Sequence, residues 1–170
     1  MAFASSEATI HAYLAQLGIS FTNYSHPPAF TCEEMTALDG LLPAGMGHIK
    51  NLFLKDKKKR YYLVSALYET KIDLKSLAKH LEAPELRFAR AEELEAVLGV
   101  TPGSVTTFAL INDQRHQVNV VLDPGIFAYT SIGLHPLRND MTTVIAPPDL
   151  EKFLLSLNYT YRTLSNHSPQ

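Results

Sequence analysis

The chain has 170 residues, of which 46% are hydrophobic and 19% are charged, and its formal net charge at pH 7 is -2. This length allows one well-buried core and excludes two ordinary domains, so we expect a single domain over residues 1–170. The nearly balanced charge excludes a surface that is basic throughout, so a nucleic-acid partner would need a local basic patch.

The first expected elements are a helix and a short strand. Apolar residues recur at three- and four-residue steps between a capping serine, Ser5 or Ser6, and Gly18, which is suited to ending a helix. Residues 19–25 alternate like a strand. The segment His26-Pro27-Pro28 should stop this strand, because prolines donate no ladder hydrogen bond and restrict the residue before them.

A short helix and a hairpin are expected next. Thr31 and Glu34 predict a capping box for a helix to about residue 38. Residues 48–55 and 61–68 are rich in Ile, Leu, Phe, Tyr and Val, which favour strands. The polar residues between these two segments therefore predict the connection of a hairpin, with a basic tip.

Two further helices are expected in the middle of the chain. Asp73 can cap a helix to about residue 82. Residues 92–98 predict another helix, which Gly99 can close.

The last third of the chain returns to strands. We expect a second hairpin with strands at 104–111 and 117–122, a further strand at 141–146, and a helix at 147–157 that begins with two prolines. The tail after residue 164 is polar and expected to be loose. Strands that come mostly as hairpins with helices between them favour an α+β fold around a mixed, mostly antiparallel sheet over a doubly wound fold.

Two polar residues, Lys50 and Asn51, stand side by side inside an otherwise apolar strand. Because side chains alternate along a strand, they face opposite sides, each among apolar neighbours. Burying an ammonium costs several kcal/mol unless it is paired or lies in a solvated cleft, which favours a functional site. The alternative is a strand end from which the lysine reaches water, and periodicity alone favours that alternative.

Four segments of the sequence favour the functional site over the strand end. They read HPPAFT at 26–31, KNLFL at 50–54, GVTPGSVT at 99–106, and HPLRN at 135–139 followed by threonines at 142 and 143. In this order, over roughly residues 6–157, the chain resembles the YbaK-like deacylases and the editing domain of bacterial prolyl-tRNA synthetases, specifically the free-standing branch that acts on alanyl-tRNA(Pro). The resemblance implies a partly barrel-like sheet with surrounding helices. It also implies a trans-editing deacylase that hydrolyses the ester of mischarged Ala-tRNA(Pro) without a cofactor.

The resemblance also assigns residues to the site. Lys50 matches the functional lysine of the family, and Asn51 is its companion. Gly103 matches the glycine of the loop near the scissile ester. His135 matches the histidine of the last segment, with Asn139 close behind it. These residues form the expected catalytic and substrate-binding set.

An aminoacyl ester is already activated, so its hydrolysis needs a positioned water and donors aimed at the developing oxyanion. We expect the N–H groups of Gly103 and Ser104 to be these donors, and Lys50 to be a charged positioning group. No protein nucleophile is expected, and a tRNA hydroxyl could help to position the water. The sequence departs from the family's pattern at Thr107, where the loop of the family commonly has proline. Whether the loop is equally rigid here is an open question.

The substrate should also be contacted outside this set. Phe30 and Thr31 could approach the substrate, although opening a helix is a sufficient structural role for them. A pocket that fits the methyl group of alanine would exclude the proline ring. The basic hairpin tip is a solvated turn by composition, and with a tRNA substrate its residues are candidates for phosphate contact. These residues are Lys55, Lys57, Lys58, Lys59 and Arg60.

Cysteine and histidine usage bears on metals and on the compartment. The single cysteine, Cys32, excludes an internal disulfide, favours a reducing compartment, and is interpreted as a structural thiol. The histidines lack the paired spacing of a zinc site, so we expect no metal. Residues 1–7 lack the pattern of a secretory signal, and no run of about 18 apolar residues occurs. We therefore expect a cytoplasmic protein with no membrane partner.

Two other functions stay open from the sequence. The first is a deacylase for another misacylated tRNA, such as Cys-tRNA(Pro). The second is a non-catalytic tRNA-binding or interaction module of the same fold. In each case the acceptor end of a tRNA is the expected partner, and a prolyl-tRNA synthetase is a second expected partner.

Overall fold

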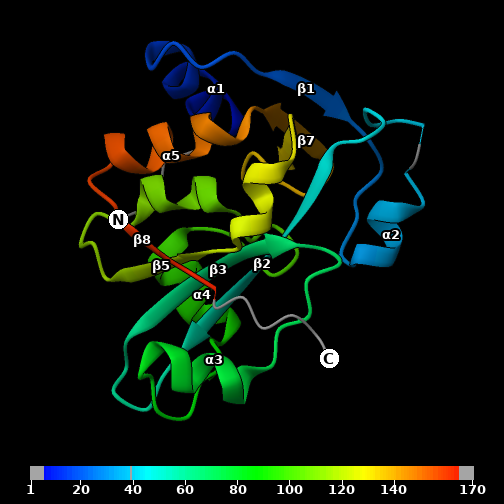
Figure 1. Cartoon of the computed structure of the whole chain (residues 1–170). Helices are drawn as coiled ribbons and strands as arrows, with labels where there is room; N and C mark the ends of the chain where they lie inside the picture. The colour runs from blue at the N-terminus through cyan, green and yellow to red at the C-terminus, as the bar shows by residue number, and fades with distance from the viewer. Residues whose placement is uncertain (1–5, 39, 165–170) are drawn as a thin grey trace.

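The structure is a computed structural model that describes residues 6–38 and 40–164 (Figure 1). Its α-helices are α1 (Glu7–Gln16), α2 (Cys32–Thr36), α3 (Leu74–Leu81), α4 (Ala91–Leu98) and α5 (Pro147–Ser156), and its 3-10 helices are η1 (Thr107–Asn112) and η2 (Pro124–Ala128). Its strands are β1 (Thr22–Ser25), β2 (Gly47–Lys55), β3 (Tyr61–Leu67), β4 (Arg87–Phe88), β5 (Val118–Leu122), β6 (Ile132–Leu134), β7 (Met141–Ile145) and β8 (Tyr161–Thr163).

The strands form one mixed sheet in the order β1-β7-β6-β2-β3-β5-β8, with β4 on β2. The pairs β1/β7, β6/β7, β2/β3 and β2/β4 are antiparallel, and the pairs β2/β6, β3/β5 and β5/β8 are parallel. This confirms the expected α+β fold with a mixed sheet. The sheet is not closed, because β1 and β8 end its pairing order without meeting, so the barrel-like closure that the resemblance implied does not occur.

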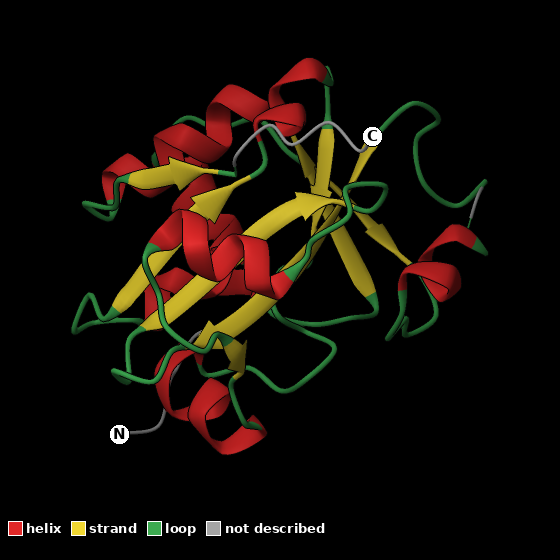
Figure 2. Ribbon diagram, turned by 60° about the horizontal axis from the view of Figure 1, so that its bottom comes forward, coloured by secondary structure: helices red, strands yellow, loops and turns green. Residues whose placement is uncertain are grey.

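Strand β2 joins the two halves of the sheet. Its first two residues, Gly47 and His48, pair with β6, whereas its partner over the rest of its length is β3. Helix α3 covers one face of the β2–β3 hairpin through Leu77 and Leu81, while α1, α4 and α5 pack on the larger core of the other face. Figure 2 shows helices on both sides of the strands.

Most expected elements are present. The first hairpin is antiparallel, the capping box of Thr31 and Glu34 is formed, and Asp73 accepts a hydrogen bond from the N–H of Ser76 at the start of α3. Gly99 ends α4 in the left-handed conformation, with φ of 66°. Among the described helices, none has the length and apolar character needed to cross a membrane. The expected loose tail after residue 164 lies outside the described residues.

The prediction of a second hairpin was wrong. Residues 107–112 form the 3-10 helix η1, and β5 pairs in parallel with β3 and β8. The side chain of Thr106 accepts a hydrogen bond from the N–H of Phe108 at 3.3 Å and so starts the helical turn. Because the segment is buried on nearly all sides, its apolar residues give no periodicity that separates a strand from a buried helix. The short strands β4, β6 and β8 were not predicted.

Candidate functional site

A cleft of about 280 Å³ opens beside β2 and brings together segments that are far apart in the sequence. Six of the eight residues predicted for catalysis or substrate binding line it: Phe30, Thr31, Lys50, Asn51, Gly103 and His135. Its other lining residues are Ala29, Cys32, Met35, Ile49, Leu52, Tyr68 and Val105. The four sequence segments that carry the resemblance therefore meet at one place or immediately beside it.

The cleft lies where one edge of β2 has no neighbouring strand. On that edge, β6 pairs with the start of β2, and β4 pairs with Leu54 and Lys55. The carbonyl of His48 accepts a hydrogen bond from the N–H of Tyr68 on the other edge. Because backbone groups of an antiparallel pair alternate in direction, the backbone N–H and C=O of Asn51 face the cleft edge.

Lys50 holds its ammonium at the end of β3. Its Nζ donates to the carbonyl of Tyr68 at 3.1 Å and to the carbonyl of Thr70. Among the described residues, no carboxylate forms an ion pair with Lys50. Carbonyls orient a cation but do not neutralise it, and an ammonium has three donors. Lys50 therefore keeps a positive charge and one further donor for a ligand in the cleft.

The loop at Gly103 approaches Phe30 closely. Gly103 has a φ of 92°, and a Cβ atom placed on it would lie 2.7 Å from Phe30 Cδ1 and 3.6 Å from Asn139 Nδ2. Only glycine fits this conformation and this space. Asn139 therefore lies beside the cleft, although it is not among its lining residues.

Ser104 differs from its predicted role. It is 7% exposed and is not among the lining residues of the cleft. Its backbone N–H donates to the carbonyl of Thr101 at 3.0 Å within the loop. The N–H of Ser104 is therefore engaged in the turn, whereas Gly103 itself lines the cleft.

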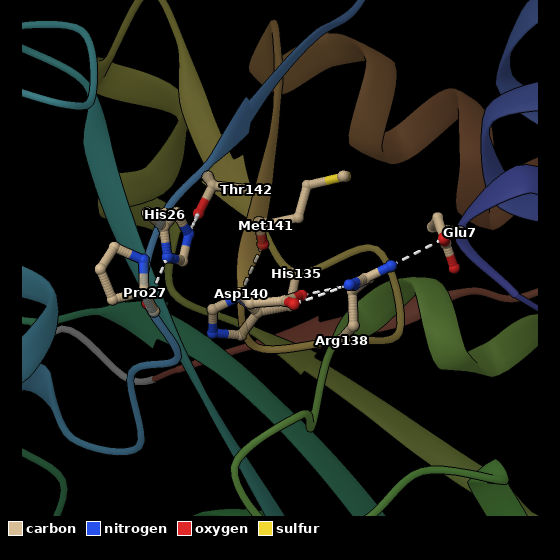
Figure 3. Close-up of polar contacts among 8 residues, drawn as sticks. All are labelled: Glu7, His26, Pro27, His135, Arg138, Asp140, Met141 and Thr142. Atoms are coloured by element: carbon tan, nitrogen blue, oxygen red, sulfur yellow. Dashed lines mark hydrogen bonds and ion pairs between the residues drawn. The ribbon is translucent and has the colours of Figure 1, made fainter.

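His135 is half-buried beside the buried His26, with ring centroids 6.4 Å apart. Its Nδ1 lies 3.1 Å from the carbonyl of Met141, so this nitrogen carries the proton and donates (Figure 3). Burial lowers the pKa of His135 below its ordinary value, and the nearby His26 acts in the same direction. The ring is therefore neutral at pH 7, and its Nε2 is a hydrogen-bond acceptor.

The loop that carries His135 is fixed at several points. Arg138 Nη1 donates to Glu7 Oε1 of α1 at 2.8 Å, and its Nη2 donates to Asp140 Oδ2 at 2.6 Å (Figure 3). The guanidinium holds the pKa of Asp140 below its usual range. The carbonyl of Asn139 accepts from the N–H of Ala29 at 3.1 Å. These contacts join the loop to α1 and to the segment before α2.

A second, much smaller cavity of about 10 Å³ lies behind the cleft. It shares Met35, Ile49, Tyr68 and His135 with the cleft, and its other lining residues are Met46, His48, Gly133, Leu134 and Thr142. A space of this size holds about one water molecule or a group of similar size. This small cavity therefore adjoins the cleft beside His135, and we call it the inner end of the cleft.

Strand β2 carries the basic tip away from the cleft. Asp56 stands six positions after Lys50, which is roughly 20 Å along a strand. Three of the five cations are paired: Lys55 with Glu93, Lys57 with Glu85 at 3.1 Å, and Arg60 with Asp56 at 2.7 Å. Within the described part of the chain, Lys58 and Lys59 have no acidic partner.

Seven lining residues of the cleft were not predicted for the site, and three of them have polar or sulfur-containing side chains. Tyr68 follows the end of β3 and could have been found from the hairpin register, which places it opposite His48. Met35 and Cys32 come from α2, and no sequence signal marks them as part of a site. Burial raises the pKa of the Cys32 thiol, so it stays protonated near neutral pH. Among the described residues, no group of three or more His, Cys, Asp or Glu side chains could hold a metal ion.

Comparisons with known proteins show which proteins this chain is similar to. The sequence model of one family, described as "Aminoacyl-tRNA editing domain", matches residues 26–153. The chain is 34% identical to the "Prolyl-tRNA editing protein ProX" of Acetoanaerobium sticklandii, over 94% of this chain and 96% of that protein. It is 38% identical to the "Prolyl-tRNA synthetase associated domain-containing protein 1" of Danio rerio, over 92% of this chain and 85% of that protein.

A solved structure shares the fold. It is provisionally described as a trans-editing enzyme for prolyl-tRNA synthetase, and it matches with a TM-score of 0.70 and 17% identity. The match covers 95% of this chain and 96% of that one.

Proposed function

This chain belongs to the aminoacyl-tRNA editing domain family, and we propose that it is a trans-editing deacylase that hydrolyses the ester of mischarged Ala-tRNA(Pro). One observation carries the proposal: Lys50, Asn51, Gly103 and His135, from three separate segments, line one cleft. Relatives that are named for prolyl-tRNA editing support a deacylase. The choice of alanine rests on the inner end of the cleft.

The reaction needs one water, one acceptor for its proton, and donors for the oxyanion. The neutral Nε2 of His135 takes a proton from the water as the water oxygen attacks the ester carbonyl carbon. The N–H of Gly103 and the ammonium of Lys50 stabilise the negative charge that develops on the carbonyl oxygen. The bond from this carbon to the ribose oxygen then breaks, and that oxygen takes the proton from His135. The products are alanine and tRNA with a free terminal hydroxyl.

The small inner cavity supports selection by size. Its volume of about 10 Å³ suits a methyl group, and the sulfur of cysteine or the ring of proline adds atoms that have no space there. A Cβ atom placed on Gly133 would lie 2.7 Å from Met46 Cε and 2.7 Å from Thr142 Cγ2, so the walls leave no slack. This observation favours alanine over cysteine as the amino acid that is released.

The mouth of the cleft suits the end of a tRNA. Phe30 is 67% exposed beside the Gly103 loop, and an exposed aromatic ring is a stacking surface for a terminal base. Thr31 lines the same mouth. Lys58 and Lys59 are the tip cations that can contact phosphates farther along the tRNA. A prolyl-tRNA synthetase is the proposed second partner, in keeping with the name of the Danio rerio relative.

The test is release of labelled amino acid from Ala-, Cys- and Pro-tRNA(Pro) by the purified chain. We expect release from the alanyl ester, much less from the cysteinyl ester, and none from the prolyl ester. Lys75→Ala, on the far helix α3, is the control for Lys50→Ala. Release from the cysteinyl ester alone would favour the related deacylase. Binding of all three without release would favour the non-catalytic module.

A further inference from the structure

Two buried hydroxyls contact the Asn51 side chain from behind the cleft. Ser65, on β3, is the cross-strand partner of Asn51, and its Oγ lies 2.6 Å from Asn51 Oδ1. Thr107, the first residue of η1, places its Oγ1 2.7 Å from Ser65 Oγ and 3.4 Å from Asn51 Oδ1. Ser65 and Thr107 are both 0% exposed. No water can replace these contacts while the residues stay buried.

The protons of this cluster determine which way the amide points. Each hydroxyl has one proton, and a buried donor needs an acceptor. With Oδ1 toward Ser65, the Ser65 proton goes to Oδ1 and the Thr107 proton goes to Ser65 Oγ or Oδ1. With the amide reversed, its NH2 would donate to Ser65, whose proton would go to Thr107. Among the described residues, Thr107 would then have no acceptor for its own proton.

We propose that Ser65 and Thr107 are positioning residues that lock the Asn51 amide with its NH2 group toward the bound ester. The inference rests on the proposed function for the identity of the ligand. Asn51 then supplies a donor to the cleft, at the strand edge that its own backbone N–H also faces. Thr107 stands four residues after Gly103 and thereby connects the Gly103 loop to β2. The departure from proline at this position supplies the hydroxyl that makes this connection.

The kinetic test removes one hydroxyl at a time. Ser65→Ala and Thr107→Val should each lower kcat/KM on Ala-tRNA(Pro) by about tenfold, the effect of one lost hydrogen bond, while Thr107→Ser keeps most of the activity. The matched control is Thr143→Val. Thr143 is also 0% exposed, and its hydroxyl donates to Asn23 Oδ1 at 2.7 Å away from the cleft. This control should leave kcat/KM within about twofold.

A double-mutant cycle separates positioning from general damage. If Ser65 acts through the Asn51 amide, then Ser65→Ala should cost nothing further in an Asn51→Ala background. An equal loss in both backgrounds would overturn the proposal. Thermal unfolding of each variant identifies any that fails to fold, and Thr107→Ala then serves in place of Thr107→Val.

An NMR measurement tests the same proposal without activity. The side-chain amide signals of Asn51 are identified by their loss in Asn51→Asp. In the wild type we expect no nuclear Overhauser effect between the Asn51 NH2 protons and the β protons of Ser65, because Oδ1 occupies that side. A strong effect there would overturn the proposal even if the chain proves to hydrolyse no aminoacyl-tRNA, an outcome that would remove only the proposed function.

Discussion

The two ends of β2 carry similar residues in different surroundings. At the cleft end, Lys50 donates to backbone carbonyls and has no carboxylate partner among the described residues. At the tip end, Lys55 pairs with Glu93, with side chains only 13% and 11% exposed. In the nearly buried ion pair the two opposite charges neutralise each other. The carbonyls that hold Lys50 orient its ammonium but do not neutralise it. We therefore propose that the cleft end binds a ligand and that the tip end contributes stability.

The largest expected effect comes from replacing each of these two lysines by methionine in turn. Lys50→Met should lower kcat/KM on Ala-tRNA(Pro) by about a hundredfold or more, because it removes a preorganised charge near the developing oxyanion. Lys55→Met should leave the chemistry intact and lower the free energy of unfolding by about 1–3 kcal/mol, because it leaves Glu93 without its close partner. Deacylation kinetics and urea unfolding measure the two effects. A stability loss at Lys50 with full activity would reverse the assignment.

The next effect concerns the inner cavity. Gly133→Ala places a methyl group against Met46 and Thr142, where the free space is about 10 Å³. We expect about a tenfold or greater fall in kcat/KM for the alanyl ester, because the added carbon takes the space of the substrate's methyl group. Met46→Ala should do the opposite and admit the cysteinyl ester. Competition between the two esters measures the ratio of their kcat/KM values. If this ratio is unchanged in both variants, the amino acid lies elsewhere in the cleft.

The pH dependence follows from His135. Burial depresses its pKa below the ordinary 6.5, so the neutral ring persists to more acidic pH. The ring stops being a proton acceptor only when the pH falls through that lowered pKa. We therefore expect kcat/KM to decline only below about pH 6.5. The folded state binds this proton less readily than the unfolded state, so stability should also fall as the pH drops below 6.5. The His135→Gln variant should lack the acid limb, and an acid limb that persists there would assign it to another group.

The sequence predicted local structure well and non-local pairing poorly. The capping box at Thr31, the cap at Asp73 and the β2–β3 hairpin depend on neighbouring residues, and all three are present. The parallel pairing of β5 with β3 depends on contacts between distant segments, which periodicity does not encode. The same limit applies to η1, whose apolar residues are buried in a way that resembles a central strand.

The site shows the same division. Lys50 and Asn51 were marked by their polarity in an apolar strand, and Gly103 and His135 by the resemblance. Their meeting in one cleft required the fold. Ser65 could not be predicted, because a serine in a strand is ordinary in sequence. Thr107 was noted only as a departure from proline, which gave no role to its hydroxyl. Their proposed role rests on distances of 2.6 and 2.7 Å between side chains whose residues are up to 42 positions apart in the chain.

The smallest expected effect concerns the tip, where lysines with and without an acidic partner are neighbours in the sequence. Lys57 pairs with the exposed Glu85, whereas Lys58 and Lys59 have no acidic partner among the described residues. A double substitution of Lys58 and Lys59 by alanine should raise KM for the tRNA by about two- to fivefold at low salt, with kcat unchanged, because phosphate contacts add affinity without touching the ester.

Lys57→Ala is the matched control for this double variant, and its own effect should be smaller because its charge is already paired. The difference in KM between the double variant and the wild type should shrink as salt is raised, because salt weakens the contacts between lysines and phosphates. A KM that does not respond to these lysines would make the tip a solvated turn. The contribution of β2 to the substrate would then end at the cleft, where its lysine and asparagine are held by carbonyl and hydroxyl groups.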